Sequence, residues 1–221
     1  MIIDPYMWTR LPIVGLEAVT AETLAVHLRR PSGYSFVPGQ YAIVRVIVPS
    51  GERLIRQYSF ISAPQDDDLS LLIQREPGGT VSGWFHSTAR VGAIIELSQP
   101  LGSFTLTQVR HRPVVLVAGK VGIAPFLSML RATPHRRAKL IYSVRQREQI
   151  VFAEEVATYD TTVIMTDVTP RIDATILTPL TVDQPVWYIC GSKQFVDAIC
   201  LLLSRLNVPS ANVRRELFTL Q

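Results

Sequence analysis

The string Arg56-Gln57-Tyr58-Ser59 holds three side chains of the kinds that can bind a flat, phosphorylated ring system. An arginine can pair with a phosphate, a tyrosine ring can stack on another ring, and a serine hydroxyl can hydrogen-bond a ring nitrogen. These are the groups that a flavin needs. Polar and apolar residues alternate over 53–60, which predicts a strand whose end faces a pocket. The alternative is an ordinary edge strand with an exposed Arg56 and a half-buried Tyr58.

The next candidate is the string GGTVS at 78–82, which begins with a glycine pair and is separated by one residue from Trp84 and Phe85. We expect a helix to begin near residue 80. Glycines that open a helix allow backbone N–H groups to approach a pyrophosphate, which the helix dipole also favours. A plain turn with a capping threonine or serine is the alternative.

A second glycine string, VAGKVGIAP at 117–125, runs from a buried apolar stretch through a turn into a predicted helix, and Pro125 suits the first turn of that helix. A strand, a glycine turn and a helix in this order form the context of a dinucleotide-binding loop. A connection without a ligand would explain the glycines but not the whole string. The turn consists of Gly119, Lys120, Val121 and Gly122.

Two further strings lie near the end of the sequence. YICGS at 188–192 again leads from a strand towards a helix, and ligands of open α/β sheets bind at the carboxyl ends of the strands. Cys190 stands at such an end, although a lone cysteine is more often a small buried apolar residue. The tail Glu216-Leu217-Phe218, taken alone, indicates only a final strand.

The elements that must position these strings change in character near residue 110. Before it, short segments rich in Val, Ile, Leu and Tyr alternate with turn clusters, which predicts an antiparallel barrel or sandwich. These segments are 24–30, 41–48, 58–61, 69–75 and 93–97. After it, apolar runs alternate with helical patterns, which predicts βαβ units and a parallel sheet. The runs are 114–118, 140–144, 163–165 and 186–190, and the clearest helical pattern is 195–206. The polar stretch 107–112 predicts a boundary between units at 1–108 and 109–221.

The composition is that of a globular protein, with 48% hydrophobic and 18% charged residues among 221. We find no signal-peptide pattern and no uninterrupted apolar stretch of bilayer length, and we therefore expect a cytoplasmic protein without a membrane span. The only cysteines, Cys190 and Cys200, suit neither a zinc site nor an iron–sulfur cluster, so we predict no bound metal.

The charge is uneven along the chain. Residues 1–110 contain nine basic and nine acidic residues, whereas residues 111–221 contain thirteen basic and nine acidic ones, which gives the whole net charge of +4. A basic half suits an anionic cofactor or an acidic protein partner. Because the basic residues are scattered and not interleaved with aromatic ones, we expect no nucleic-acid partner.

Taken in order, the strings resemble the ferredoxin–NADP reductase superfamily. Its members carry Arg-x-Tyr-Ser, Gly-x-x-Ser, Gly-Gly-x-Gly-Ile-x-Pro, Cys-Gly and a closing Glu-x-aromatic, and the match covers essentially the whole chain. The resemblance implies an N-terminal antiparallel Greek-key β-barrel that binds FAD, followed by a Rossmann-like parallel α/β unit that binds NADP or NAD. It also implies a reductase that passes electrons between NADPH or NADH and a separate acceptor, such as a ferredoxin, a flavodoxin or an oxygenase component. Since the sequence shows no cluster or haem segment, we expect that acceptor to be external.

The same resemblance implies the residues that hold the flavin. Arg56 would bind a flavin phosphate, Tyr58 would pack on the isoalloxazine, Ser59 would hydrogen-bond near its N5 atom, and Phe218 would cover the other ring face. The other implied flavin-binding residues are Ile73, Arg75, Gly79, Thr80, Val81 and Ser82. A pyrophosphate bound at residues 79–82 would favour FAD over FMN.

The candidate catalytic residues follow from the resemblance as well. They are Ser59, Cys190 and Glu216, with the last two near the nicotinamide. The implied nucleotide-binding residues are Gly119, Lys120, Val121, Gly122, Cys190, Gly191 and Ser192.

One position departs from the family pattern, because Lys120 replaces the second glycine of the nucleotide loop. A glycine there permits close approach of the backbone to a pyrophosphate. A lysine adds bulk, but its ammonium can itself bind phosphates. Two of the three lysines, Lys120 and Lys193, fall in loops expected to face the nucleotide, so we favour a phosphate-binding Lys120. In the alternative, Lys120 obstructs the loop, and the chain is a flavin-binding electron-transfer or regulatory subunit with impaired nicotinamide binding.

The choice between NADPH and NADH depends on the stretch 142–147, which leaves the second strand of the α/β unit. An acidic residue there favours NADH, whereas an arginine accommodates the 2′-phosphate of NADPH. Arg145 matches a position that the family often uses in this way, and Arg171 is a second candidate. We therefore predict NADPH, with a solvated arginine at a strand end as the alternative.

Overall fold

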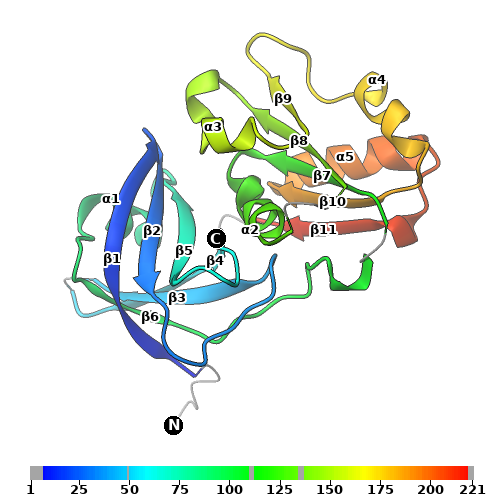
Figure 1. Ribbon diagram of the computed structural model, residues 1–221. Coiled ribbons are helices and arrows are strands. Elements are labelled where there is room, and N and C mark those ends of the chain that lie inside the picture. Colours follow the sequence, from blue (N-terminus) through cyan, green and yellow to red (C-terminus); the bar gives the residue numbers. More distant parts are fainter. Residues whose placement is uncertain (1–6, 49, 110–111, 134–136, 219–221) are drawn as a thin grey trace.

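The computed structural model describes residues 7–48, 50–109, 112–133 and 137–218. Two sheets form its framework, one from residues before 98 and one from residues after 113 (Figure 1). The predicted order, an antiparallel β unit followed by a parallel α/β unit, is confirmed.

The first sheet has six strands in the order β4-β3-β6-β1-β2-β5, and every paired neighbour is antiparallel. The strands are β1 (Thr9–Thr20), β2 (Thr23–Arg29), β3 (Tyr41–Ile47), β4 (Arg53–Ser59), β5 (Asp68–Gln74) and β6 (Ile94–Leu97). Exposed and half-buried residues alternate along β4, as a strand with one face over a core requires. The helix α1 (Thr80–Ser87) follows β5 and buries Val81 and Phe85 against the same core.

The first strand, β1, was not predicted. Pro12 and Gly15 interrupt its apolar pattern, and both residues are normally depleted from strands. The strand forms because it pairs on both sides, with β6 through its first residues and with β2 through its later ones. The register shifts beside Gly15, so the sheet absorbs the irregularity there.

The second sheet has five strands in the order β11-β10-β7-β8-β9, all parallel. They are β7 (Val114–Gly119), β8 (Ala138–Val144), β9 (Thr161–Met165), β10 (Val186–Gly191) and β11 (Val213–Leu217). The central strands β7 and β10 are buried at every residue, which explains their unbroken apolar sequences.

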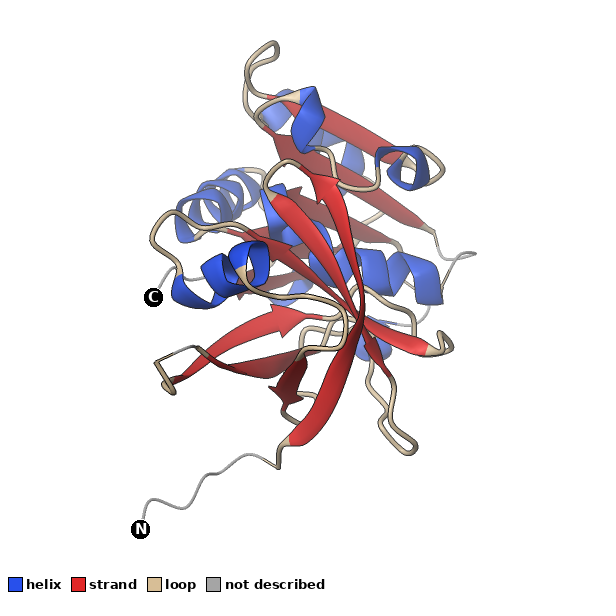
Figure 2. Cartoon of the chain, turned by 90° about the vertical axis from the view of Figure 1, so that its left-hand side faces the viewer, coloured by secondary structure: helices blue, strands red, loops and turns tan. Residues whose placement is uncertain are grey.

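Helices cover both faces of this sheet (Figure 2). The helix α2 (Ala124–Ala132) packs on one face with Leu116, Leu140 and Tyr188. The helix α5 (Lys193–Arg205) packs on the other face with Val117 and Trp187. Two short helices, α3 (Ala153–Val156) and α4 (Ala174–Leu177), lie in the connections after β8 and β9.

The two sheets share one hydrophobic cluster, which joins Ala25, Ile61 and Leu72 of the first unit to α2 and the inner strands of the second. The segment between the units also packs into this junction. Phe104 contacts the ring of Tyr188 at 5.2 Å between centroids, and the Tyr188 hydroxyl donates to the carbonyl oxygen of Thr105 at 2.8 Å. The segment that connects the two units is therefore packed against β10.

Within the described residues, no helix has both the length and the apolar character that a bilayer crossing requires.

Candidate functional site

The turn after β7 forms as a 3-10 helix, Lys120–Ile123, that leads directly into α2. Its Gly122 lies against β10: a methyl group on Gly122 would stand 2.3 Å from the carbonyl oxygen of Cys190 and 2.6 Å from its carbonyl carbon. Real side chains do not tolerate such a contact with backbone, so only glycine fits. The turn is thereby pressed against the end of β10, where Cys190 and Gly191 lie.

The residue Lys120 adopts a left-handed backbone conformation, with φ of 50°. That region costs a residue other than glycine about 1–2 kcal/mol. The backbone of Lys120 therefore has a conformation that glycine adopts without strain, and its side chain, which ends in an ammonium group, is exposed. Strain of this kind at a loop is a common mark of a functional position.

Gly119 and Gly191 lie next to each other at the ends of β7 and β10. A methyl group on either would come within 2.9 Å of the Phe195 ring, which fills the space beside them. Phe195 follows Ser192, whose hydroxyl accepts a hydrogen bond from the Phe195 N–H at 3.3 Å and caps α5. The predicted nucleotide residues at the two strand ends are thus brought together.

Ser59, Cys190 and Glu216 meet at the junction of the two units. Cys190 and Glu216 are paired neighbours on β10 and β11, and Ser59 ends β4 of the first sheet. Among the described residues, neither the buried Oγ of Ser59 nor the buried Oε1 of Glu216 has a hydrogen-bond partner. Such buried polar atoms are costly and normally satisfied, so their position indicates a place where a ligand supplies the missing partners.

The same position changes the acidity of two of these groups. Burial raises the pKa of Glu216 to about 7; the nearby Ser59 hydroxyl lowers it in part, although its geometry falls short of a hydrogen bond. Burial, and then the negative charge of Glu216, raise the pKa of the Cys190 thiol. Cys190 is therefore an uncharged thiol near neutral pH, and Glu216 can gain or lose a proton there.

On the barrel side, Tyr58 stands half-buried beside α1, with its ring edge-on to Phe85 at 6.1 Å. Burial raises the pKa of its hydroxyl, with the Arg56 guanidinium acting in the opposite direction. The first turn of α1 begins at Thr80 after Gly79, and the predicted helix start is confirmed. Ser82 accepts a hydrogen bond from the Glu76 N–H at 3.2 Å through its Oγ, so it supports the turn before α1.

The remaining flavin candidates on this side differ in what they can offer. Ile73 is fully buried in the barrel core, so only its backbone can face a ligand. Arg75 is exposed at the end of β5, and its N–H bonds the carbonyl oxygen of Glu22 at 2.7 Å. Phe218 follows β11, and its N–H bonds the carbonyl oxygen of Gly191 at 2.9 Å, which ties the tail to the end of β10.

A pocket of about 150 Å³ opens between the units beside Lys120. The barrel contributes the β1–β2 turn and Gln74, and the α/β unit contributes the turn after β7 and the segment after β8. Lys120 and Val121 were predicted to bind the nucleotide, but the contribution of the barrel residues 20–23 and 74 was not predicted, because the lining combines four separate segments of the chain. The lining residues are Thr20, Ala21, Glu22, Thr23, Gln74, Lys120, Val121, Tyr142, Gln146, Glu148, Gln149 and Val151.

Arg145 lies at the end of β8, as predicted, but it already has a partner. Its Nε donates to Oδ1 of Asp167 at 3.0 Å, and Gln146 and Arg145 together hold the pKa of Asp167 below its usual range. Asp167 lies two residues beyond β9, and this contact between strand ends gave no signal in the sequence. Arg171 is exposed farther along the same loop.

The residues present fit a flavin at the junction. The orphaned Ser59 hydroxyl and the aromatic ring of Tyr58 lie at the end of β4, and the Tyr58 ring contacts Phe85 of α1, whose amide-bearing start follows Gly79. Across the junction stand the turn after β7, Cys190 and Glu216. The arrangement can therefore hold a flat ring between two sets of groups, one from each unit.

Comparison with known proteins gives the same assignment. The model of the oxidoreductase FAD-binding domain family matches residues 11–106. The flavohemoprotein of Oceanobacillus iheyensis is 30% identical over 212 residues, which cover 83% of this chain and 52% of that protein. The toluate 1,2-dioxygenase electron transfer component of Pseudomonas putida is 31% identical over 229 residues, covering 93% and 66%. The chain thus spans about half the length of that flavohemoprotein.

Two solved structures share the fold over nearly the whole chain. The FAD/NAD-binding domain of the nitric oxide dioxygenase from Vibrio cholerae superposes with a TM-score of 0.85 at 24% identity, covering 95% of this chain and 98% of that one. Phthalate dioxygenase reductase superposes with a TM-score of 0.79 at 26% identity, covering 95% and 68%. Both sheets of the present chain are therefore arranged as in these proteins.

Proposed function

The chain belongs to the ferredoxin–NADP reductase superfamily and carries an oxidoreductase FAD-binding domain, and from this premise we propose that it passes electrons between NADPH or NADH and a separate acceptor. The observation that carries the proposal is the pair of orphaned polar atoms, Ser59 Oγ and Glu216 Oε1, one from each unit. We assign residues 1–108 to the flavin and residues 109–221 to the nucleotide.

In this proposal the flavin supplies the hydride and single-electron chemistry, and the protein supplies binding and orientation. Arg56 and the first turn of α1 hold the phosphates, and Tyr58 packs against the ring. Ser59 donates its free hydroxyl to the ring edge, and the turn after β7 receives the nucleotide phosphates. Glu216 and Cys190 border the nicotinamide and exclude water from it.

We expect Lys120→Gly to weaken nucleotide binding about tenfold, because it removes a cation from the phosphate loop. Binding should also lose part of its salt dependence. The same change should raise the melting temperature, since glycine adopts the left-handed conformation of residue 120 without strain. Stopped-flow reduction and binding titrations at low and high salt measure the first two effects.

Lys120→Arg is the matched control, because it keeps the charge and should keep the salt dependence. Tighter binding and faster flavin reduction in the glycine variant would contradict the phosphate-binding role of Lys120. That result would favour the alternative function, a flavin-binding relay or regulatory subunit in which the lysine impairs nicotinamide binding.

The ion pair between Arg145 and Asp167 gives opposite expectations for two substitutions. Arg145→Ala should lower the preference for NADPH over NADH about tenfold or more, because an arginine accommodates the 2′-phosphate. Asp167→Asn should raise that preference about tenfold, because it frees the guanidinium and removes a carboxylate that repels the phosphate. The ratio of kcat/KM for the two nucleotides measures both. Equal changes with NADPH and NADH would reject this assignment.

For the acceptor we favour an acidic redox protein, such as a ferredoxin, a flavodoxin or an oxygenase component. Ion pairs with Glu155, Asp183, Asp160, Asp167 and Asp197 already engage five basic residues of the second unit. The net charge of +4 remains, and it would steer an acidic partner towards the chain.

The proposal is tested by following oxidation of NADPH and NADH with ferricyanide or an acidic ferredoxin as acceptor. Turnover should require added FAD and should not be supported by FMN. Turnover that is independent of flavin, or equal with FMN, would contradict it.

A further inference from the structure

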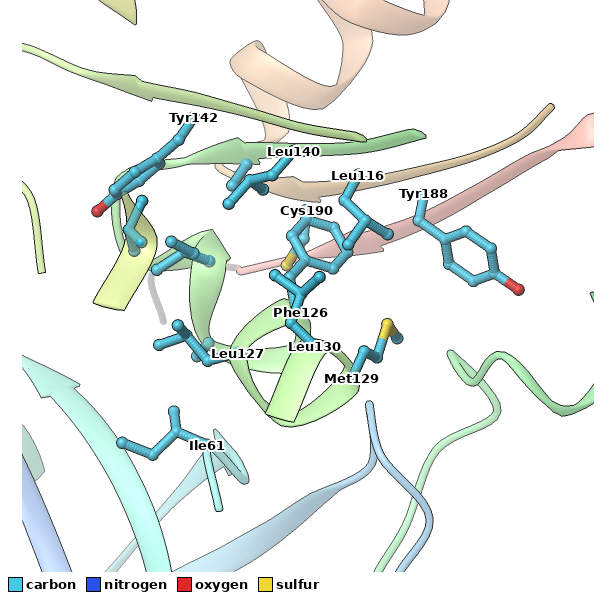
Figure 3. Packing of buried hydrophobic residues seen from close by; sticks show 14 of the residues in the cluster. Ile61, Leu116, Phe126, Leu127, Met129, Leu130, Leu140, Tyr142, Tyr188 and Cys190 are labelled. Carbon is cyan, nitrogen blue, oxygen red and sulfur yellow. The ribbon is translucent and has the colours of Figure 1, made fainter. Parts of the chain in front are cut away.

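The helix α2 connects the two halves of the candidate site. It begins at the turn that carries Lys120 and Gly122, and nine residues later it ends against the barrel, about 13 Å away at 1.5 Å per residue. Residues 124–130 are all buried. Figure 3 shows α2 between the strands of the second sheet and Ile61 of the first unit. A shift of this helix would therefore move the nucleotide turn and its barrel contact together.

The polar contact at the far end of α2 is made by Arg131. Its Nη1 donates to the carbonyl oxygen of Ile61 at 2.8 Å. Its Nε and Nη2 donate to the two carboxylate oxygens of Glu155 at 2.8 and 2.6 Å. The paired fork geometry fixes the plane of the guanidinium, so the remaining nitrogen is aimed at the barrel backbone.

Further contacts hold the Arg131–Glu155 pair in place. Glu155 also accepts a hydrogen bond from the Tyr159 hydroxyl at 2.7 Å, and Phe152 lies 5.0 Å from the guanidinium. The side chains of Arg131 and Glu155 are only 23% and 29% exposed. The pair is therefore better shielded from water than a surface ion pair, and its two parallel hydrogen bonds fix how the two side chains lie relative to each other.

A second bond ties the same helix to the next residue of the barrel. Ser128 Oγ donates to the carbonyl oxygen of Ser62 at 2.7 Å, and both residues are fully buried. The consecutive carbonyl groups of Ile61 and Ser62 are thus both bonded to side chains of α2. Ile61 lies two residues after Ser59, so the bonds fix the end of β4 where the orphaned hydroxyl stands.

Interfaces between units of one chain commonly permit relative motion. The groups that border the proposed flavin come from both units, and an error of about 1 Å in their separation can cost about a hundredfold in rate. We infer that Arg131 is a positioning residue. It acts through Ile61 and α2 to set the distance between β4, which ends at Ser59, and the turn Lys120–Ile123. This inference deepens the proposed function and rests on it for its kinetic consequence.

The test compares Arg131→Met with Arg137→Met. Arg137 forms an ion pair with Asp183 in the same unit, but the two side chains are 80% and 52% exposed, so its loss should change little. Hydrogen exchange of the apoprotein needs neither flavin nor nucleotide. The amides of Phe60 and Ile61, which bond to Gln40 and Ser70, should exchange about tenfold faster in Arg131→Met and unchanged in Arg137→Met.

The kinetic arm measures the limiting rate of flavin reduction at saturating nucleotide. Arg131→Met should lower it about tenfold to a hundredfold, with KM and FAD affinity changed by less than about threefold. Arg131→Lys should recover part of the rate because it restores a donor towards Ile61. If Arg131→Met does not fold, Arg131→Met/Glu155→Gln avoids an unpaired half-buried carboxylate, and Ser128→Ala removes the neighbouring bond alone.

Unchanged exchange at residues 60–61, or an unchanged limiting rate, would overturn the inference. A loss of rate that merely follows a loss of bound FAD would overturn it as well. If the wild-type flavin is reduced by neither nucleotide, the proposed function fails, while the exchange arm still decides whether Arg131 holds the barrel strand.

Discussion

Replacing Gly122 with alanine is expected to slow reduction of the bound flavin by about a hundredfold or more. The added methyl would stand 2.3 Å from the Cys190 carbonyl oxygen, which is backbone within a buried strand and cannot rotate away. The turn after β7 must then move by about an ångström. Displacements of that size cost about a hundredfold when reacting groups must be aligned. Overpacking should also destabilise the chain by about 1–3 kcal/mol.

Stopped-flow reduction at several nucleotide concentrations measures this effect, together with FAD affinity and the melting temperature. Gly15→Ala is the control: its methyl would meet the His27 side chain at 3.1 Å, far from the turn, and a side chain can give way. FAD affinity should survive in both variants, because the flavin strand β4 is untouched. If the flavin bound to Gly122→Ala is reduced at the wild-type rate, the close contact between the turn and β10 is not needed for reduction.

Replacing Glu216 with glutamine is expected to stabilise the apoprotein at alkaline pH. The pKa of Glu216 is raised from its ordinary 4.5 to about 7 by burial. Between those two values the folded chain binds a proton that the unfolded chain has released, so folding stability falls as pH rises through that window. Glutamine has no charge to lose. At pH 8 the variant should therefore be more stable than wild type by up to about 3 kcal/mol, and at pH 4 the two should be nearly equal.

Denaturant unfolding at pH 4, 6 and 8 gives the comparison. Glu148→Gln, which changes an exposed carboxylate of the α/β unit, should leave the pH dependence of stability as in wild type. Stability curves of Glu216→Gln and wild type that run parallel from pH 4 to 8 would contradict the raised pKa of Glu216. In the flavin-loaded wild type we expect the reduction rate to change near pH 7, where Glu216 gains or loses its proton, and we expect Glu216→Gln to lack that change.

Local patterns were sufficient for most of the fold. Four barrel strands, β2, β3, β5 and β6, and the parallel strands β7 to β10 have bounds within two residues of the predicted segments. The predicted segment 58–61 covers only the end of β4, although the alternation over 53–60 matches that strand, and β11 begins three residues before the predicted tail. The strand β1 was missed because its pairing on two sides outweighs the effect of Pro12 and Gly15. Its conformation is decided by partners far away in sequence.

The residues of the candidate site also divide into those that a local sequence pattern identifies and those that it does not. The strings around Ser59 and Gly122 were identifiable because each carries a chemical pattern within a few residues, and the roles of Cys190 and Glu216 were implied by resemblance alone. The pairing of Arg145 with Asp167 and of Arg131 with Ile61 joins residues 22 and 70 positions apart. No local pattern indicates such contacts. The left-handed backbone of Lys120 was also unpredicted, since lysine has no preference for it.

One anaerobic experiment tests whether the barrel holds a flavin that nicotinamide nucleotide, bound by the α/β unit, can reduce. The purified chain is saturated with FAD, freed of excess cofactor, and mixed with NADPH or NADH in a stopped-flow spectrometer. We expect the protein to retain the visible flavin absorbance and then to lose it on reduction, with a rate that saturates as nucleotide concentration rises. A chain that retains no FAD, or whose bound FAD stays oxidised with both nucleotides, would contradict it.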